Sequence, residues 1–405
     1  MKISISRDRD VLNTFMSGVL IFSIVYMIGF PKGGVKIYGI PLTIGYILSG
    51  LLLILAMTRI DLSKIPINRV IVIIFAGILS FWSWGIIFAN GFQKSGFALA
   101  YFIATLYLPI FGMIAFSGLI MDKLSGPVLL AIKISIRFVI LYGIFLFIFK
   151  YITGSWIEIP YLTVNADDIG SLDDKYINRG GIFKLISTYN NGNIFGVCMA
   201  IIGPIYLYLE ENKIFKITLM IAMLLTLSRT VWIAMILINL FSIASQGRGV
   251  KQIFNIALFT ILGLVSLSVV LAFMGRDLSF LFDKNLGGRA GMLFSVSEAK
   301  FIPTGAFKDI SEIVYVGVLN GFGFFGLVLF LLYLLSPIAL LLLGGTPLFS
   351  RRPDSACLQG LVIYAIIACS DGAFSYIPVM MIYWMVAGLG FWYQREVKRR
   401  FREAR

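Results

Sequence analysis

Three arginines have neighbours that suit them to bind an anion. Arg179 is followed by two glycines, and Arg289 is preceded by two. Glycine lets the backbone approach an anion closely, while the planar guanidinium bonds two of its oxygens. Arg229 follows Ser228 inside an otherwise apolar run. The three arginines therefore predict sites for a phosphate-bearing sugar; the alternative is that they are interfacial anchors or form loop salt bridges.

Carboxylates give weaker signals. Glu312 lies where a polar segment meets an apolar run, so partial desolvation would raise its pKa toward that of a useful base. The alternative is an ordinary acid at a helix start. The string DDIGSLDD lacks the alternating ligand spacing of a calcium loop, so we interpret it as a solvated acidic loop.

Histidine, the commonest metal ligand and general base, does not occur in the chain. The three cysteines lie inside apolar runs and lack a paired metal-ligand spacing. We expect no metal and no cofactor, and chemistry based on carboxylates, arginines and lysines.

The elements that must position these residues are transmembrane helices. The 405 residues are 59% hydrophobic and 13% charged, too apolar for a soluble chain. Apolar runs of about 20 residues recur, each long enough to cross a hydrocarbon core of roughly 30 Å. These runs do not alternate apolar and polar residues, which excludes a transmembrane barrel. We predict an all-α bundle of about 12 helices, forming a single integral membrane domain over residues 1–405. The expected spans are 11–30, 37–57, 70–90, 97–117, 127–149, 193–209, 213–228, 230–245, 252–274, 314–335, 357–374 and 378–393.

Basic residues predict the orientation. With the N-terminus inside, the cytoplasmic segments hold 21 of the 34 basic residues and 9 of the 20 acidic ones, as the positive-inside rule requires. This arrangement needs two crossings, or a re-entrant pair, within 213–245. The basic tail from Arg395 to Arg405 is then a cytoplasmic anchor on anionic lipid, not a nucleic-acid site. Both termini are predicted to be cytoplasmic.

Two external loops are long enough to hold a site, 150–192 and 275–313. Both mix aromatic, basic and acidic residues with glycine. Function is expected there, because the other connections are short.

Residues 179–330 resemble the O-antigen polymerase (Wzy-type) and O-antigen ligase superfamily of bacterial envelope proteins. The resemblance rests on three places: Arg179-Gly180-Gly181 before the asparagine-rich string Tyr189-Asn190-Asn191-Gly192-Asn193; the Ser228-Arg229 step; and the segment from Gly287 to the glycine-rich helix near Gly321, with Pro303 and Gly305. The N-terminal half resembles the family in hydropathy alone.

The resemblance implies a metal-independent membrane glycosyltransferase with a GT-C-like fold in the bacterial inner membrane and its active site in the periplasm. The donor would be a glycan on undecaprenyl pyrophosphate, and the acceptor a sugar hydroxyl. Arg229 and Arg289 would then hold the pyrophosphate and Arg179 would guide it. Glu312 would assist deprotonation, and Tyr189 and Tyr315 would line the sugar path.

The resemblance leaves alternatives. Ligases of the superfamily use a histidine near the start of the helix after the last loop, where this chain has Ser311 and Glu312; that difference favours a polymerase over a ligase. A flippase or transporter for the same lipid-linked sugars would also have about twelve helices, but no internal repeat is evident. Besides membrane lipid, a chain-length regulator and a flippase are expected partners by family analogy, and nucleic acid is not.

Overall fold

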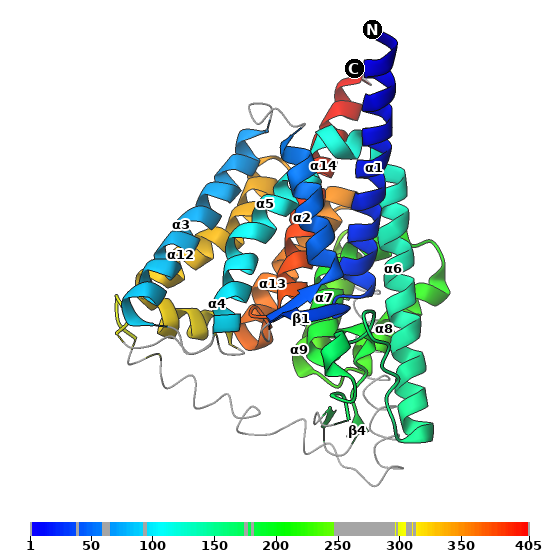
Figure 1. The fold of residues 1–405 in the computed structure, drawn as a ribbon, viewed down its shortest axis with the longest axis vertical. Coiled ribbons are helices and arrows are strands. Elements are labelled where there is room, and N and C mark those ends of the chain that lie inside the picture. Colours follow the sequence, from blue (N-terminus) through cyan, green and yellow to red (C-terminus); the bar gives the residue numbers. More distant parts are fainter. Residues whose placement is uncertain are drawn as a thin grey trace.

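The chain folds into a helical bundle, and its N- and C-termini lie at the same end of the molecule (Figure 1). The computed structural model describes residues 2–37, 40–58, 65–91, 95–173, 177–179, 182–246, 296, 299–304, 310 and 313–403. Within these residues the helices are α1 (Lys2–Gly29), α2 (Ile44–Met57), α3 (Ile67–Asn90), α4 (Ser95–Phe102), α5 (Leu108–Ala115), α6 (Gly118–Thr153), α7 (Gly192–Leu209), α8 (Lys213–Leu224), α9 (Arg229–Ala244), α12 (Val314–Leu343), α13 (Pro353–Asp371) and α14 (Ile377–Glu403). A π-helical turn, Ile103–Tyr107, joins α4 to α5.

Six described helices are long and apolar enough to cross a membrane, which confirms the prediction of a helical membrane protein. They are Ile67–Asn90, Ala98–Ala115, Leu124–Thr153, Gly192–Leu209, Val314–Leu343 and Pro353–Asp371. Shorter apolar helices cover Phe15–Gly29, Ile44–Met57 and Arg229–Ala244. A described helix lies in every expected span except 252–274, which is outside the described residues. The number of crossings and their direction stay predictions.

Two small sheets modify the all-α expectation. Strands β1 (Gly34–Ile37) and β2 (Ile40–Thr43) form an antiparallel hairpin, so α2 begins at Ile44, not at residue 37 as expected. β-Branched residues favour strands, and a hydropathy run cannot separate them from a helix of the same apolar character. Strands β3 (Asn178–Arg179) and β4 (Ile182–Phe183) pair in the first long loop.

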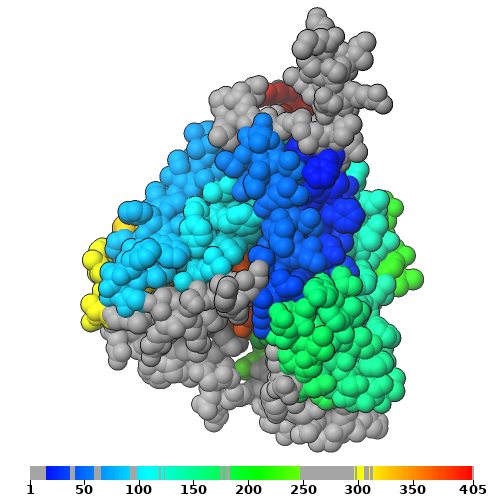
Figure 2. Space-filling model, viewed as in Figure 1, coloured from blue at the N-terminus to red at the C-terminus, as the bar shows by residue number. Residues whose placement is uncertain are grey.

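The loop between α6 and α7 has a small core of its own. Leu146, Trp156, Val164, Leu172 and Ile186 form a cluster of buried apolar residues separate from the main core. In the space-filling view, this green segment lies directly against the blue N-terminal elements (Figure 2).

Ion pairs fix this loop to its neighbours. Lys36 of β1 donates its backbone N–H to Asp167 at 3.0 Å and pairs through Nζ with Asp168. Lys150, near the end of α6, lies 2.9 Å from Asp173. Three acids of the DDIGSLDD string therefore bind lysines of the adjacent elements.

The centre of the bundle is α14, which is buried on all sides from Ile377 to Gln394. Helices that are apolar all round are typical of such positions. Glycines let α14 pass very close to α5: a Cβ at Gly112 would lie 2.4 Å from the carbonyl oxygen of Trp384, and one at Gly388 would lie 2.3 Å from that of Gly112. Either substitution would force the two helices apart.

A buried carboxylate closes the far end of α7. Glu210, 1% exposed, accepts two hydrogen bonds of 2.7 Å from Arg137 and one of 2.9 Å from the Asn212 backbone N–H. The hydrogen bonds from Arg137 lower the pKa of Glu210 to about 2. The carboxylate therefore stabilises the fold as an anion.

Acid is expected to remove this stabilisation. Because the folded pKa lies below the unfolded value of 4.5, the contribution is complete above that value and is lost as the pH falls toward about 2. Thermal unfolding in detergent, followed between pH 7 and pH 3, should show a flatter decline for Glu210→Gln than for the wild type. Glu403→Gln, an exposed acid on α14, should retain the wild-type profile. Identical profiles for all three proteins would contradict this assignment.

Candidate functional site

Three helix ends meet at the end of the bundle that carries the β1–β2 hairpin (Figure 1). α7 and α9 begin there, α13 ends there, and the three helices pack against one another. Each of these ends has a neighbouring residue with positive φ: Asn190 (57°), Leu227 (51°) and Ala373 (48°). Residues other than glycine adopt this conformation at an energetic cost, and such residues concentrate at functional sites.

Polar side chains connect the three ends. Asn191 caps α7 by accepting hydrogen bonds from the backbone N–H groups of Asn193 (2.8 Å) and Ile194 (3.2 Å). Asn193 donates its side-chain N–H to the carboxylate of Asp371 at 2.9 Å. Thr230, at the start of α9, shares a 3.2 Å hydrogen bond with Ser370 of α13.

Asp371 is the most distinctive residue of this group. Asp371 is only 3% exposed, and a buried carboxylate requires hydrogen-bond donors or a counter-charge. Lys32, which follows α1, lies at the same end, with its Nζ 5.8 Å from the ring centre of Tyr376. The arrangement concentrates a carboxylate, an amide, hydroxyls and a lysine where several helices end.

Arg229 is the first residue of α9 and lines a large cavity. The cavity has a volume of about 1190 Å³ and lies between α7, α8, α9 and the start of α13. The N-cap residue Ser228 makes no side-chain capping bond within the described residues. An anion beside Arg229 would therefore also meet the partial positive charge of the α9 N-terminus.

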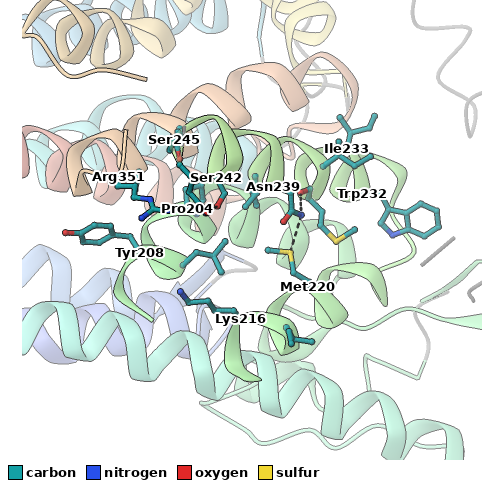
Figure 3. A pocket seen from close by; sticks show the side chains of 18 of the residues that line it. Pro204, Tyr208, Lys216, Met220, Trp232, Ile233, Asn239, Ser242, Ser245 and Arg351 are labelled. Carbon is teal, nitrogen blue, oxygen red and sulfur yellow. Dashed lines mark hydrogen bonds between the residues drawn. The ribbon is translucent and has the colours of Figure 1, made fainter. Parts of the chain in front are cut away.

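The cavity follows α9 from Arg229 toward Arg351. Its wall is mainly aliphatic, with Trp232 near the Arg229 end and Asn239 midway. Asn239 donates to the Met235 carbonyl at 2.8 Å and lies 3.9 Å from the Met220 sulfur (Figure 3). Arg351 and Tyr208 line the end away from Trp232, and Lys216 lines the facing wall on α8 (Figure 3). An apolar cavity with cations at both ends suits a lipid that carries phosphate.

The predicted anion-binding arginines are only partly described. Arg229 is half-buried at the cavity. Arg179 belongs to β3, but its side chain lies outside the described part of the chain. Arg289 and Glu312 are also outside it. Whether the three arginines share one site stays a prediction.

The two tyrosines that were predicted to line the sugar path make hydrogen bonds between helices. Tyr189 is fully buried, and its hydroxyl donates to the carbonyl of Ile28 at the end of α1, at 3.0 Å. Tyr315 is half-buried and donates to the Ala365 carbonyl of α13 at 2.7 Å. In this structure both tyrosines join helices, and their role along a sugar path stays a prediction.

Sequence reasoning did not single out Asp371. The signal was present, because Asp371 is the sole acidic residue between Asp354 and Glu396. An ionisable residue at the edge of such an apolar stretch is a functional candidate by default. Its partner Asn193 belongs to the asparagine-rich string that carried the resemblance.

Within the described residues, no group of three or more histidine, cysteine, aspartate or glutamate side chains is placed to hold a metal ion. No protein-family model, no curated protein and no solved structure matches this chain.

Proposed function

We propose that the chain is an O-antigen polymerase, a membrane glycosyltransferase that joins lipid-linked oligosaccharide repeats on the periplasmic side of the bacterial inner membrane. One observation carries the proposal. Arg229 begins α9 and lines an apolar cavity of about 1190 Å³. The next residue, Thr230, shares a hydrogen bond with Ser370, which precedes the buried Asp371. A cation for a diphosphate and a carboxylate for a proton therefore belong to the same end of the bundle.

The reaction would use these groups in separate roles. The acceptor hydroxyl oxygen attacks the anomeric carbon of the donor, and the bond between that carbon and the pyrophosphate oxygen breaks. Arg229 and the α9 N-terminus stabilise the negative charge that develops on the departing lipid pyrophosphate. Arg289 and Arg179 add to this positive field, as the resemblance implies.

The hydroxyl proton needs an acceptor, and two carboxylates are candidates. Glu312 is the candidate from the sequence, and Asp371 is the candidate from the structure. Asn193 donates a hydrogen bond of 2.9 Å to one oxygen of Asp371, which orients the carboxylate at the end of α13 where a base could act.

The polyprenyl chain would occupy the part of the cavity next to Arg229. The wall there includes Ile233 and Ile236 of α9, which are both exposed. Such a wall favours an aliphatic chain that enters from the bilayer.

Deletion of the gene in the bacterium that encodes it tests this function. We expect cells that display single repeat units and no long chains, because repeats are made and exported but not joined. Gel electrophoresis of the surface glycan, with a plasmid-complemented strain as control, reads the chain length. Loss of all surface repeats would instead indicate a flippase, and a normal ladder would reject both functions.

A further inference from the structure

The end of the cavity opposite Arg229 has charges that the proposed reaction does not use. α9 has 16 residues, so it is about 24 Å long at 1.5 Å per residue. At its far end Lys216 of α8 and Arg351, which precedes α13, line the cavity together with Tyr208. Figure 3 shows Arg351 and Tyr208 at the end away from Trp232, with Lys216 on the facing wall.

These two cations differ from their neighbour Arg352. Arg352 also lines the cavity but is bound by Asp354, at 3.0 Å through Nε and 2.5 Å through Nη2. None of the ion pairs between described residues includes Lys216 or Arg351. Two like charges beside one cavity repel each other, and an anion between them would remove that repulsion.

The wall between the two ends is apolar and accessible from the side. Ile217 of α8 is 59% exposed and Ile221 44%, and both line the cavity. In a membrane protein, exposed aliphatic side chains between helices contact acyl chains. The cavity volume of about 1190 Å³ also exceeds the roughly 300–1,000 Å³ typical of pockets for small drug-sized molecules.

The charge pattern specifies the leaflet. Lys216 and Arg351 both belong to segments that the positive-inside rule predicts to be cytoplasmic. The cytoplasmic leaflet is rich in anionic lipid, and basic pockets between transmembrane helices on that side bind lipid head groups.

We propose that Lys216 and Arg351 bind the phosphate of an anionic phospholipid from the cytoplasmic leaflet, whose acyl chains lie along α8. Tyr208 lines the same end of the cavity. This site is distinct from the proposed catalytic end, about 24 Å away along α9. Its test does not require glycosyltransferase activity, so either proposal can fail without the other.

Native mass spectrometry of the full chain in a non-ionic detergent tests the head-group contact. The protein is mixed with equal concentrations of phosphatidylglycerol and phosphatidylcholine. We expect the wild type to retain phosphatidylglycerol preferentially. Replacing both Lys216→Gln and Arg351→Gln should weaken that binding about 30-fold, from the effect of two membrane-surface cations. Lys213→Gln is the matched control and should bind like the wild type, because Lys213 is an exposed cation on the same helix, α8, but does not line the cavity.

A second pair of variants tests the acyl-chain contact. Ile217→Trp places a larger side chain in the wall of the cavity, and it should lower phosphatidylglycerol binding without changing any charge. Ile214→Trp, one turn earlier on α8, is the control, because Ile214 is 69% exposed but does not line the cavity. These variants keep the proposal testable if the double charge variant does not fold.

Three results would overturn the proposal. Equal retention of the two lipids by the wild type would show that the cations do not select an anion. An equal loss of binding in Lys213→Gln would show general surface attraction. Displacement of phosphatidylglycerol by excess inorganic phosphate alone would show a phosphate site in which the chains have no part.

Discussion

Arg229→Ala is expected to lower glycan chain extension about 100- to 1,000-fold, the usual effect of removing one donor to a developing oxyanion. Arg229 begins α9 and lines the cavity, so its loss removes the charge proposed to stabilise the departing pyrophosphate. Arg229→Lys should retain part of the activity, because lysine keeps the charge but not the planar pair of donors. The measurement is the length distribution of surface glycan in a complemented deletion strain.

Asp371→Asn tests the other half of the same site. Asparagine has nearly the same shape and can still accept the hydrogen bond from Asn193, but it cannot take up a proton from the acceptor hydroxyl. Chain extension should therefore fall while the protein remains folded. Glu403→Gln, an exposed acid on α14, is the control.

The activities of these variants can be compared only at equal amounts of protein in the membrane. Each variant is compared with wild type at matched membrane abundance, with Arg402→Ala on the exposed end of α14 as the control arginine. Full-length glycan from Arg229→Ala would reject the proposed pyrophosphate site. Full activity of Asp371→Asn would leave Glu312 as the remaining carboxylate candidate.

The largest expected effect on stability comes from Arg69. Arg69 is 3% exposed. Its guanidinium donates hydrogen bonds to the carbonyls of Met113 (2.5 Å), Phe116 (2.9 Å) and Gly388 (3.3 Å). These bonds hold α3, the C-terminal end of α5 and α14 together. Two of the acceptors are carbonyls near a helix C-terminus, which carries partial negative charge. A buried cation is thus satisfied by backbone oxygens.

Arg69→Ala should destabilise the protein by on the order of 4 kcal/mol, because hydrogen bonds to charged groups contribute about 1.5–3 kcal/mol each and are not fully additive. Arg69→Lys should recover only part of this loss, since an ammonium group cannot span all three carbonyls. Thermal unfolding in detergent, with folded protein measured by size-exclusion chromatography, gives the comparison.

The control for this prediction is Arg395→Ala. Arg395 pairs with Asp122 at 3.4 Å, but its side chain is 55% exposed, and exposed ion pairs contribute about 0–1 kcal/mol. A small change in Arg395→Ala and a large one in Arg69→Ala would support the assignment. Equal unfolding temperatures for wild type and Arg69→Ala would contradict it.

Much of the architecture could be predicted because hydropathy is a local property. A stretch of about 20 apolar residues must form its own backbone hydrogen bonds in lipid, and a helix satisfies this requirement within the stretch itself. The expected spans at 70–90, 193–209 and 314–335 therefore coincide with α3, α7 and α12. The prediction of a helix was wrong at 37–43, where two short strands pair in a hairpin.

The sequence by itself determined that this chain is a membrane-embedded helical protein, and it identified Arg229 as a charge that needs an explanation. Only the tertiary structure decided which polar groups meet. Asn193 and Asp371 are 178 positions apart, and Arg69 and Gly388 are 319 apart. No periodic pattern encodes such pairs, because they arise when helices pack and their buried polar groups find partners. The same packing placed Tyr189 against Ile28 and gave the cavity a cation at each end.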